Sequence, residues 1–154
     1  MSYTTSKAQS AIGVVLSIGP IVGTATPTYT PIFELTAAPI SGRTWTIEEV
    51  TNFNSGYSKE YIKTLLDQGK VNLSGNRVST DPGQVALQAA FLDNANAYLF
   101  KLTYPLEAGQ STTGDSETFG ALVLDKMPDI TMGKTIKMSC SLQITGTVTY
   151  TEGA

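Results

Sequence analysis

The last strand-like segment of the chain constrains its fold more than any other feature. From residue 136 to residue 150, apolar and hydrophilic side chains alternate with the two-residue period of a β-strand. The apolar side holds Ile136, Met138, Cys140, Leu142, Ile144, Val148 and Tyr150, with Gly146 among them. Unbroken, such a strand would reach roughly 50 Å, and Gly146 is the position where it could bend. A strand with one wet face is typical of a barrel wall, a channel lining or the exposed sheet of a sandwich.

Alternation and turn residues also dominate the rest of the chain, so the fold class is predicted to be mainly β. We expect two antiparallel sheets forming a β-sandwich or barrel with one short flanking helix. The expected strands cover residues 13–18, 32–36, 43–51, 71–73, 97–104 and 118–124, in addition to the C-terminal one. A polar loop is expected over residues 107–117, which are rich in Gly, Ser and Thr.

The single helix is predicted over residues 82–92. Asp81 can cap it, Pro82 suits its first position, and Gln84 completes a capping box. Leu87, Ala90 and Phe91 would share one face.

The residue inventory argues against catalysis and cofactor binding. The 154-residue chain has no His and one Cys, which removes the usual general base, the commonest metal ligand and any intramolecular disulfide. Cys140 lies in an alternating strand and is predicted to be a buried structural thiol. Glu48 and Glu49 are adjacent on a strand, so they point to opposite faces and cannot form a carboxylate pair. We expect no enzymatic activity, no metal and no cofactor.

Charge argues in addition against tight nucleic-acid binding. The net charge is −3, only 15% of residues are charged, and the basic residues are scattered. A chain so poor in charge often hides part of its surface against copies of itself.

The length suits one domain, residues 1–154. Residues 1–10 are polar and are predicted to form a flexible N-terminal arm. The apolar residues that follow, 11–22, are broken by Gly, Ser and Pro and are too short to span a bilayer, so neither a secretion signal nor a membrane anchor is expected. A cytoplasmic product is the expected default.

A long connection over residues 52–70 interrupts the strand pattern. It carries several large apolar side chains but is too short to build a core of its own. Such a segment either folds back on its domain or is buried in a partner. The alternative to partner contact is an amphipathic helical turn over residues 58–66, docked on its own domain.

The sequence of this region resembles that of a known protein family. Residues 45–76 read WTIEEVTNFNSGYSKEYIKTLLDQGKVNLSGN. The order of their short motifs resembles the tail tube proteins of long-tailed phages: Val50-Thr51, Asn54-Ser55-Gly56, Lys59-Glu60-Tyr61-Ile62, Leu65-Leu66-Asp67, Gly69 and Gly75-Asn76. The helix at 81–92, the strand at 97–102 and the closing SLQITGTVT at 141–149 continue the resemblance, which covers the chain from about residue 44 onward. The Ile62-Lys63-Thr64 step departs from it, because a tight turn would be expected there.

The resemblance implies a structural role. Members of this family form hexameric rings that stack into a hollow tube, through which DNA and a length-measuring protein pass. Further implied partners are tail tip or baseplate initiator proteins and terminator proteins. The implied location is the virion, in the phage tail, after synthesis in the bacterial host cytoplasm.

The resemblance also implies two groups of functional residues. The long connection would contact a neighbouring subunit or ring through Phe53, Asn54, Ser55, Gly56, Tyr57, Lys59, Glu60, Tyr61 and Leu65. The hydrophilic side of the C-terminal strand would form a wet lumen or outer wall, with Lys137, Ser139, Ser141, Gln143 and Thr145.

Two other functions stay open at this point. The chain could be the inner tube protein of a contractile injection or secretion apparatus, in which case a sheath gene would lie beside its gene. It could instead be a monomeric β-sandwich binding module with an aromatic platform on its loops. The only Trp, Trp45, is expected to pack in the core, which disfavours the binding module.

Overall fold

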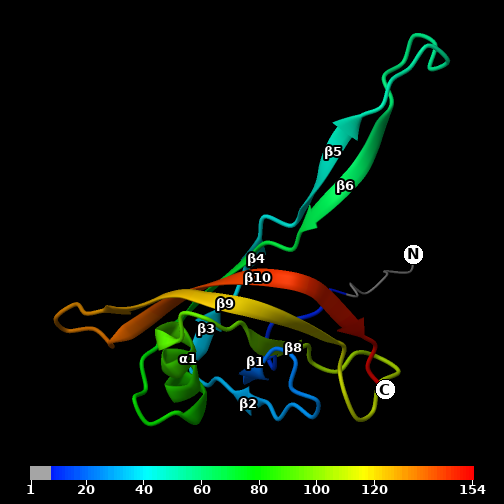
Figure 1. The fold of residues 1–154 in the computed structure, drawn as a ribbon. Helices are drawn as coiled ribbons and strands as arrows, with labels where there is room; N and C mark the ends of the chain where they lie inside the picture. Colours follow the sequence, from blue (N-terminus) through cyan, green and yellow to red (C-terminus); the bar gives the residue numbers. More distant parts are fainter. Residues whose placement is uncertain (1–7) are drawn as a thin grey trace.

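A curled antiparallel sheet makes up most of the structure, a computed structural model that describes residues 8–154 (Figure 1). Its eight strands are β1 (Val15–Ile21), β2 (Thr30–Pro31), β3 (Leu35–Ala37), β4 (Ile40–Ser41), β7 (Lys70–Asn76), β8 (Tyr98–Thr103), β9 (Ser116–Asp129) and β10 (Lys137–Thr151). A second sheet contains only β5 (Thr44–Glu49) and β6 (Tyr61–Asp67), which pair as a hairpin. The helix α1 (Pro82–Leu92) lies against the large sheet.

The large sheet runs in the order β2-β1-β8-β9-β10-β7-β3, with β4 also paired to β7. The long strand β10 is its centre, because it pairs with β9 on one side and with β7 on the other. The sheet curls so that β9 and β10 lie above β1, β2 and α1 (Figure 1). Its concave side holds the core.

The core is built from the alternate residues of these strands, as the two-residue period requires. Its largest fully buried side chains are Phe100, Phe119, Ile18, Leu73, Leu87, Met138, Leu142, Val71 and Cys140. The rings of Phe100 and Phe119 stack across the β8–β9 pair, with 6.0 Å between their centroids.

The predicted alternation of the C-terminal strand is confirmed from Met138 to Ile144, where the apolar side chains are buried. The bend at Gly146 is also found. Gly146 has φ +80°, a value that favours glycine, and the pairing of β10 with β9 shifts register between Thr145 and Thr149. Beyond this point the burial pattern is lost, and Tyr150 is exposed.

The predicted helix is confirmed, with one difference at its start. Asp81 caps the helix by accepting a hydrogen bond from the Gln84 amide at 3.1 Å. The Gln84 side chain does not complete a capping box. It accepts from the Val78 amide and donates to the carbonyls of Phe33 and Asn76, so it ties the helix to β7 and to the β2–β3 connection. Leu87 and Ala90 are buried as predicted.

The fold class is confirmed: the protein is mainly β, with two antiparallel sheets and one short helix. Two local predictions were wrong. The second half of the predicted 52–70 connection is the strand β6, so neither a loop nor the alternative helical turn over 58–66 is present there. Trp45 is 45% exposed on β5 and takes no part in the core.

The predicted N-terminal arm over residues 1–10 falls largely on residues 1–7, which lie outside the described residues. Within residues 8–154 there is no helix both long enough and apolar enough to cross a membrane.

Two leucines on the paired strands β9 and β10 provide a matched test of the core. Leu142 is fully buried, whereas Leu124 is 48% exposed. We expect Leu142→Ala to lower the free energy of unfolding by about 2–5 kcal/mol, because it leaves a cavity, and Leu124→Ala to lower it by less than about 1 kcal/mol. Denaturant unfolding of dilute protein measures both, and equal losses would contradict the assigned core.

The predicted burial of Cys140 is confirmed, and burial raises the pKa of its thiol to about 12. Since the thiolate is the reactive form, the folded protein should resist alkylation by iodoacetamide at pH 8. In denaturant the pKa returns to its ordinary range and the same thiol should react fully. Mass spectrometry of protein labelled with and without denaturant measures this, and rapid labelling of the folded protein would contradict it.

Candidate assembly interface

The hairpin of β5 and β6 projects from the curled sheet as an arm (Figure 1). We define the arm as residues 44–67, with residues 50–60 as its tip. Every residue of both its strands is exposed. Apolar side chains on it are therefore in solvent, among them Ile47 (60% exposed) and Leu65 (75%). An isolated two-stranded hairpin is only marginally stable in water. We therefore expect this arm to pack against another surface.

Polar contacts within the tip hold its shape. Ser55 Oγ donates to Glu60 Oε2 at 2.7 Å and accepts from the Asn52 amide at 3.0 Å. The Glu60 amide donates to Thr51 Oγ1 at 3.0 Å, which closes the tip above the last strand pair. The segment is thus a compact turn of its own.

The aromatic side chains of the tip have no such contacts. Phe53 and Tyr57 are 109% and 111% exposed, so both are as accessible as in an extended peptide. Large apolar side chains presented in this way are typical of protein interaction sites. The predicted inter-subunit residues all lie on this arm: Phe53, Asn54, Ser55, Gly56, Tyr57, Lys59 and Glu60 in the tip, and Tyr61 and Leu65 on β6.

The base of the arm is fastened to the sheet. The Gly69 carbonyl accepts hydrogen bonds from the Ile144 amide and from Gln143 Nε2, both at 3.1 Å. Gly69 has φ +90°, and a Cβ there would collide with the Ser41 carbonyl, so only glycine fits. Arg43 donates to the Gln68 carbonyl and pairs with Glu117 on β9 at 3.3 Å. These contacts fix the direction in which the arm leaves the sheet.

The second predicted group lies along one face of β10. Lys137 and Thr145 are exposed, and Ser139, Ser141 and Gln143 are half-buried. Strand register places Asn76, Ser74, Asn72 and Lys70 of β7 opposite them, whereas their partners on β9 are mixed: Asp129 and Asp125, but also Met127, Leu122 and Gly120. The structure therefore brings the five predicted residues together in a face that is hydrophilic on β10 and β7 and mixed on β9.

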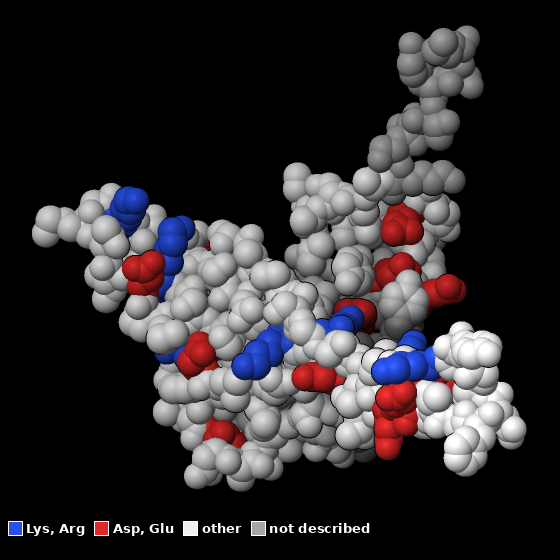
Figure 2. Space-filling model, turned by 90° about the horizontal axis from the view of Figure 1, so that it is seen from above, with Lys and Arg blue, Asp and Glu red and all other residues white. Residues whose placement is uncertain are grey.

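Acidic and basic side chains are mixed on this side of the molecule. Figure 2, viewed from above, onto β9 and β10, shows charged residues singly and in small groups, with no large area of one sign. The three-strand face itself holds Lys70, Lys137, Asp125 and Asp129, two of each sign. A surface of this kind hydrates well and does not concentrate positive charge.

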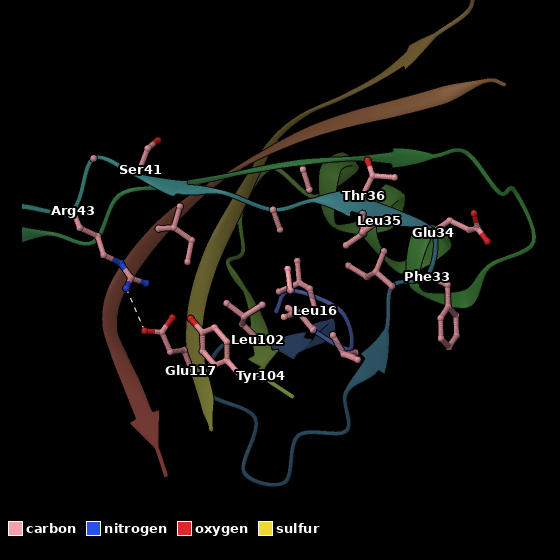
Figure 3. A pocket seen from close by; sticks show the side chains of 18 residues that line it. Leu16, Phe33, Glu34, Leu35, Thr36, Ser41, Arg43, Leu102, Tyr104 and Glu117 are labelled. Atoms are coloured by element: carbon pink, nitrogen blue, oxygen red, sulfur yellow. Dashed lines mark hydrogen bonds and ion pairs between the residues drawn. The ribbon is translucent and has the colours of Figure 1, made fainter. Parts of the chain in front are cut away.

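A third feature was not predicted: an apolar cleft of about 800 Å³ at the open edge of the curled sheet (Figure 3). One wall is formed by β3, β4 and the residues that lead to β5, and the other by β1, β8 and β9. Its apolar lining comes from Val14, Val15, Leu16, Ile32, Leu35, Ala38, Ile40 and Leu102.

Two acidic residues at the cleft, Glu34 and Glu117, have unusual local conformations or contacts. Glu34 has φ +64°, which makes it the only non-glycine residue with positive φ in the part of the chain that the structure describes. Strained backbone of this kind collects at functional sites. Glu117 pairs with Arg43 through Oε1, while its Oε2 is buried and has no hydrogen-bond partner among the described residues. Burial and the charge of Glu117 raise the pKa of the neighbouring Tyr104.

Sequence reasoning missed the cleft because its walls come from segments far apart in the chain. It also ended β9 at residue 124, whereas the strand continues to Asp129 and forms a second projecting tip with exposed Ile130 and Met132. Met132-Gly133, just before the alternating segment, was a turn signal that could have indicated this hairpin. No group of three or more His, Cys, Asp or Glu within residues 8–154 is placed to hold a metal.

Comparison with the models of protein families gives no match, and comparison with curated protein sequences gives none either. Solved structures do match over nearly the whole chain. The tube-terminating cap of the anti-feeding prophage superposes with a TM-score of 0.67 at 11% identity, covering 99% of this chain and 97% of that one. The tail of an empty GTA particle gives 0.67 at 13% identity, over 94% and 99% of the two chains. The SPP1 tail tube gives 0.58 at 16% identity, over 94% and 80%.

These comparisons agree with the architecture described above. The curled sheet, the single helix and the projecting hairpin together make up the fold that the similar structures cover almost end to end. The chain has the fold of phage tail tube and contractile injection system proteins.

Proposed function

We propose that this protein is the structural subunit of a phage tail tube. Copies of it assemble into hexameric rings, the rings stack into a hollow tube, and DNA passes through the lumen. The observation that carries the proposal is the arm, whose two strands are exposed at every residue and which is rich in apolar side chains. The shared fold supports the same function.

Burial of the arm would supply part of the assembly free energy. Fully burying one Phe-sized side chain contributes about 1.5–3 kcal/mol. Phe53 and Tyr57 together would then contribute roughly 3–6 kcal/mol before the cost of association. The apolar side chains of β5 and β6 add to this sum.

The shape of the subunit favours a ring over a symmetric dimer. An arm that projects to one side and contacts a different surface on its neighbour can form a heterologous, head-to-tail interface. Heterologous contacts form closed rings when the rotation between neighbours closes. Six subunits are proposed because similar structures have sixfold symmetry, as in the anti-feeding prophage baseplate and the GTA tail.

We infer that the hydrophilic face of β10 lines the lumen or a wet wall of the tube. Its hydroxyl and amide groups are hydrated, and its few charges are of both signs. A wall without clustered Lys or Arg does not hold a polyanion, so DNA slides along it. In this function the protein performs no catalysis and needs no cofactor.

Other proteins would complete the tail. The proposed partners are an initiator at the tail tip or baseplate, a terminator that caps the tube, and a length-measuring protein inside it. The subunit would be made in the bacterial host cytoplasm and end in the virion. Similar structures include a baseplate, a cap and a tube terminator, which supports partners of these kinds.

A second candidate function is the inner tube of a contractile injection apparatus. It is favoured by the likeness to the PVC sheath-tube complex, with a TM-score of 0.64 over 94% of this chain. A sheath gene beside the gene for this protein would favour this second function over the first.

The arm is tested by Tyr57→Asp. A carboxylate cannot enter an apolar contact without a large desolvation cost, so rings and tubes should be absent at concentrations where the wild type forms them. Circular dichroism and thermal unfolding should be unchanged, because Tyr57 contributes nothing to the core. Gln88→Asp on the exposed side of α1 is the control for an added negative charge. Normal tubes from Tyr57→Asp, seen by negative-stain electron microscopy, would refute the role of the arm.

The lumen assignment is tested by Ser141→Lys. If this face lines the lumen, one added lysine in every subunit creates repeated rings of positive charge that attract DNA phosphates. DNA release from particles should slow, and more salt should restore it. Intact tails with unchanged release kinetics would show that the face points elsewhere.

A further inference from the structure

The arm and the cleft are both incomplete in the single chain. The tip presents aromatic side chains that are fully exposed within residues 8–154, and the cleft exposes the apolar side chains of Val14 and Val15 beside wall residues that belong to the core. We propose that the tip of one subunit's arm, with Phe53 and Tyr57, docks in the apolar cleft of a neighbouring copy of this chain. The inference rests on the proposed tube function and names the surface that receives the arm.

A subunit cannot fill its own cleft with its own tip. Arg43 lines the cleft, and the arm begins at the next residue, so its base is part of the cleft wall. From there the arm points away from the sheet (Figure 1). Residues 44–50, at about 3.3 Å each, carry the tip roughly 20 Å from its base. The hydrogen bonds at Gly69 fasten this base to β10.

The side chains that line the cleft favour the docking of an aromatic side chain that carries a hydrogen-bond donor. Its walls are largely aliphatic, which suits a ring, and its volume of about 800 Å³ lies in the range of pockets that enclose whole ligands. Glu117 Oε2 is a buried carboxylate oxygen beside the Tyr104 side chain, and it has the capacity to accept a further hydrogen bond from a docked side chain. Figure 3 shows Glu117 beside Tyr104, with Arg43 across from it.

Tyr57 fits these requirements. Its ring can be buried against the apolar wall, and its hydroxyl can donate to Glu117 Oε2. Phe53, on the same tip, supplies a second ring without a polar group to satisfy. The other projecting tip, residues 130–136 between β9 and β10, is a poorer occupant because it carries no aromatic side chain.

The arrangement also explains why one subunit provides both surfaces. In a head-to-tail arrangement each copy uses its arm once and its cleft once. In a closed ring, every arm then occupies a cleft and every cleft holds an arm.

Cross-linking between two single-cysteine variants tests the contact. Asn54→Cys places a thiol on the tip without removing either aromatic ring, and Ala38→Cys places one in the cleft. Neither variant can form the bond within one chain, so the two are mixed, assembled and treated with a short thiol cross-linker. The expected result is a cross-linked dimer of these two variants. The native Cys140 is buried and adds no background.

Matched controls decide between occupants of the cleft. Asn54→Cys mixed with Gln88→Cys, on the exposed side of α1, should give no dimer. Cross-linking of Ala38→Cys to Met132→Cys, or to Ser6→Cys near the N-terminus, in place of Asn54→Cys would overturn the proposal and assign another occupant. If wild-type protein forms no rings or tubes, the tube function fails; if tubes form without the Asn54–Ala38 cross-link, only this docking fails.

A double-mutant cycle tests the hydrogen bond. Tyr57→Phe keeps the ring and removes the donor, so the concentration needed for assembly should rise about tenfold. In a Glu117→Ala background the same change should have almost no further effect, because the acceptor is already gone. Equal effects in both backgrounds would show that Tyr57 does not contact Glu117.

Discussion

The central position of β10 is the constraint on which the rest of the structure depends. β10 pairs with β7 over residues 137–143 and with β9 over residues 137–151, so it joins the two halves of the sheet. Its buried side closes the core, and its other side forms the hydrophilic face. Because consecutive side chains point to opposite sides, one strand serves both purposes without conflict. The base of the arm is also attached to it, through Ile144 and Gln143.

The sequence predicted the features that depend on local rules. The alternation of residues 138–144, the cap at Asp81 and the bend at Gly146 each follow from short-range geometry. The three contacts of the Gln84 side chain could not be predicted, because they join residues up to 51 positions apart. The positive φ of Glu34 was equally hidden, since its backbone conformation depends on the packing of β3 against β7.

The arm shows most clearly where sequence reasoning fails. Trp45 and Ile47 lie on an alternating, β-branched segment that is indistinguishable in composition from a core strand. A two-residue period indicates a strand, but it does not show what packs against the two faces of that strand. No described core residue of this chain packs over these side chains, and Trp45, which was expected in the core, is half exposed. The prediction that residues 52–70 contact a partner came from the resemblance and from their apolar content. Their strand β6 was missed although the turn residues Asn54-Ser55-Gly56 and Gly69 flank it.

The arm and the cleft share a piece of backbone, and this gives the proposed contact a direction. Ser41, Gly42 and Arg43 line the cleft and also lead into β5. Arg43 holds Glu117 at the cleft and the Gln68 carbonyl at the base of the arm. A tip that enters the cleft therefore meets the residues that orient the next arm. Each docked arm would set the angle of its successor through this junction, and a constant angle between neighbours is the condition for a heterologous contact to close into a ring.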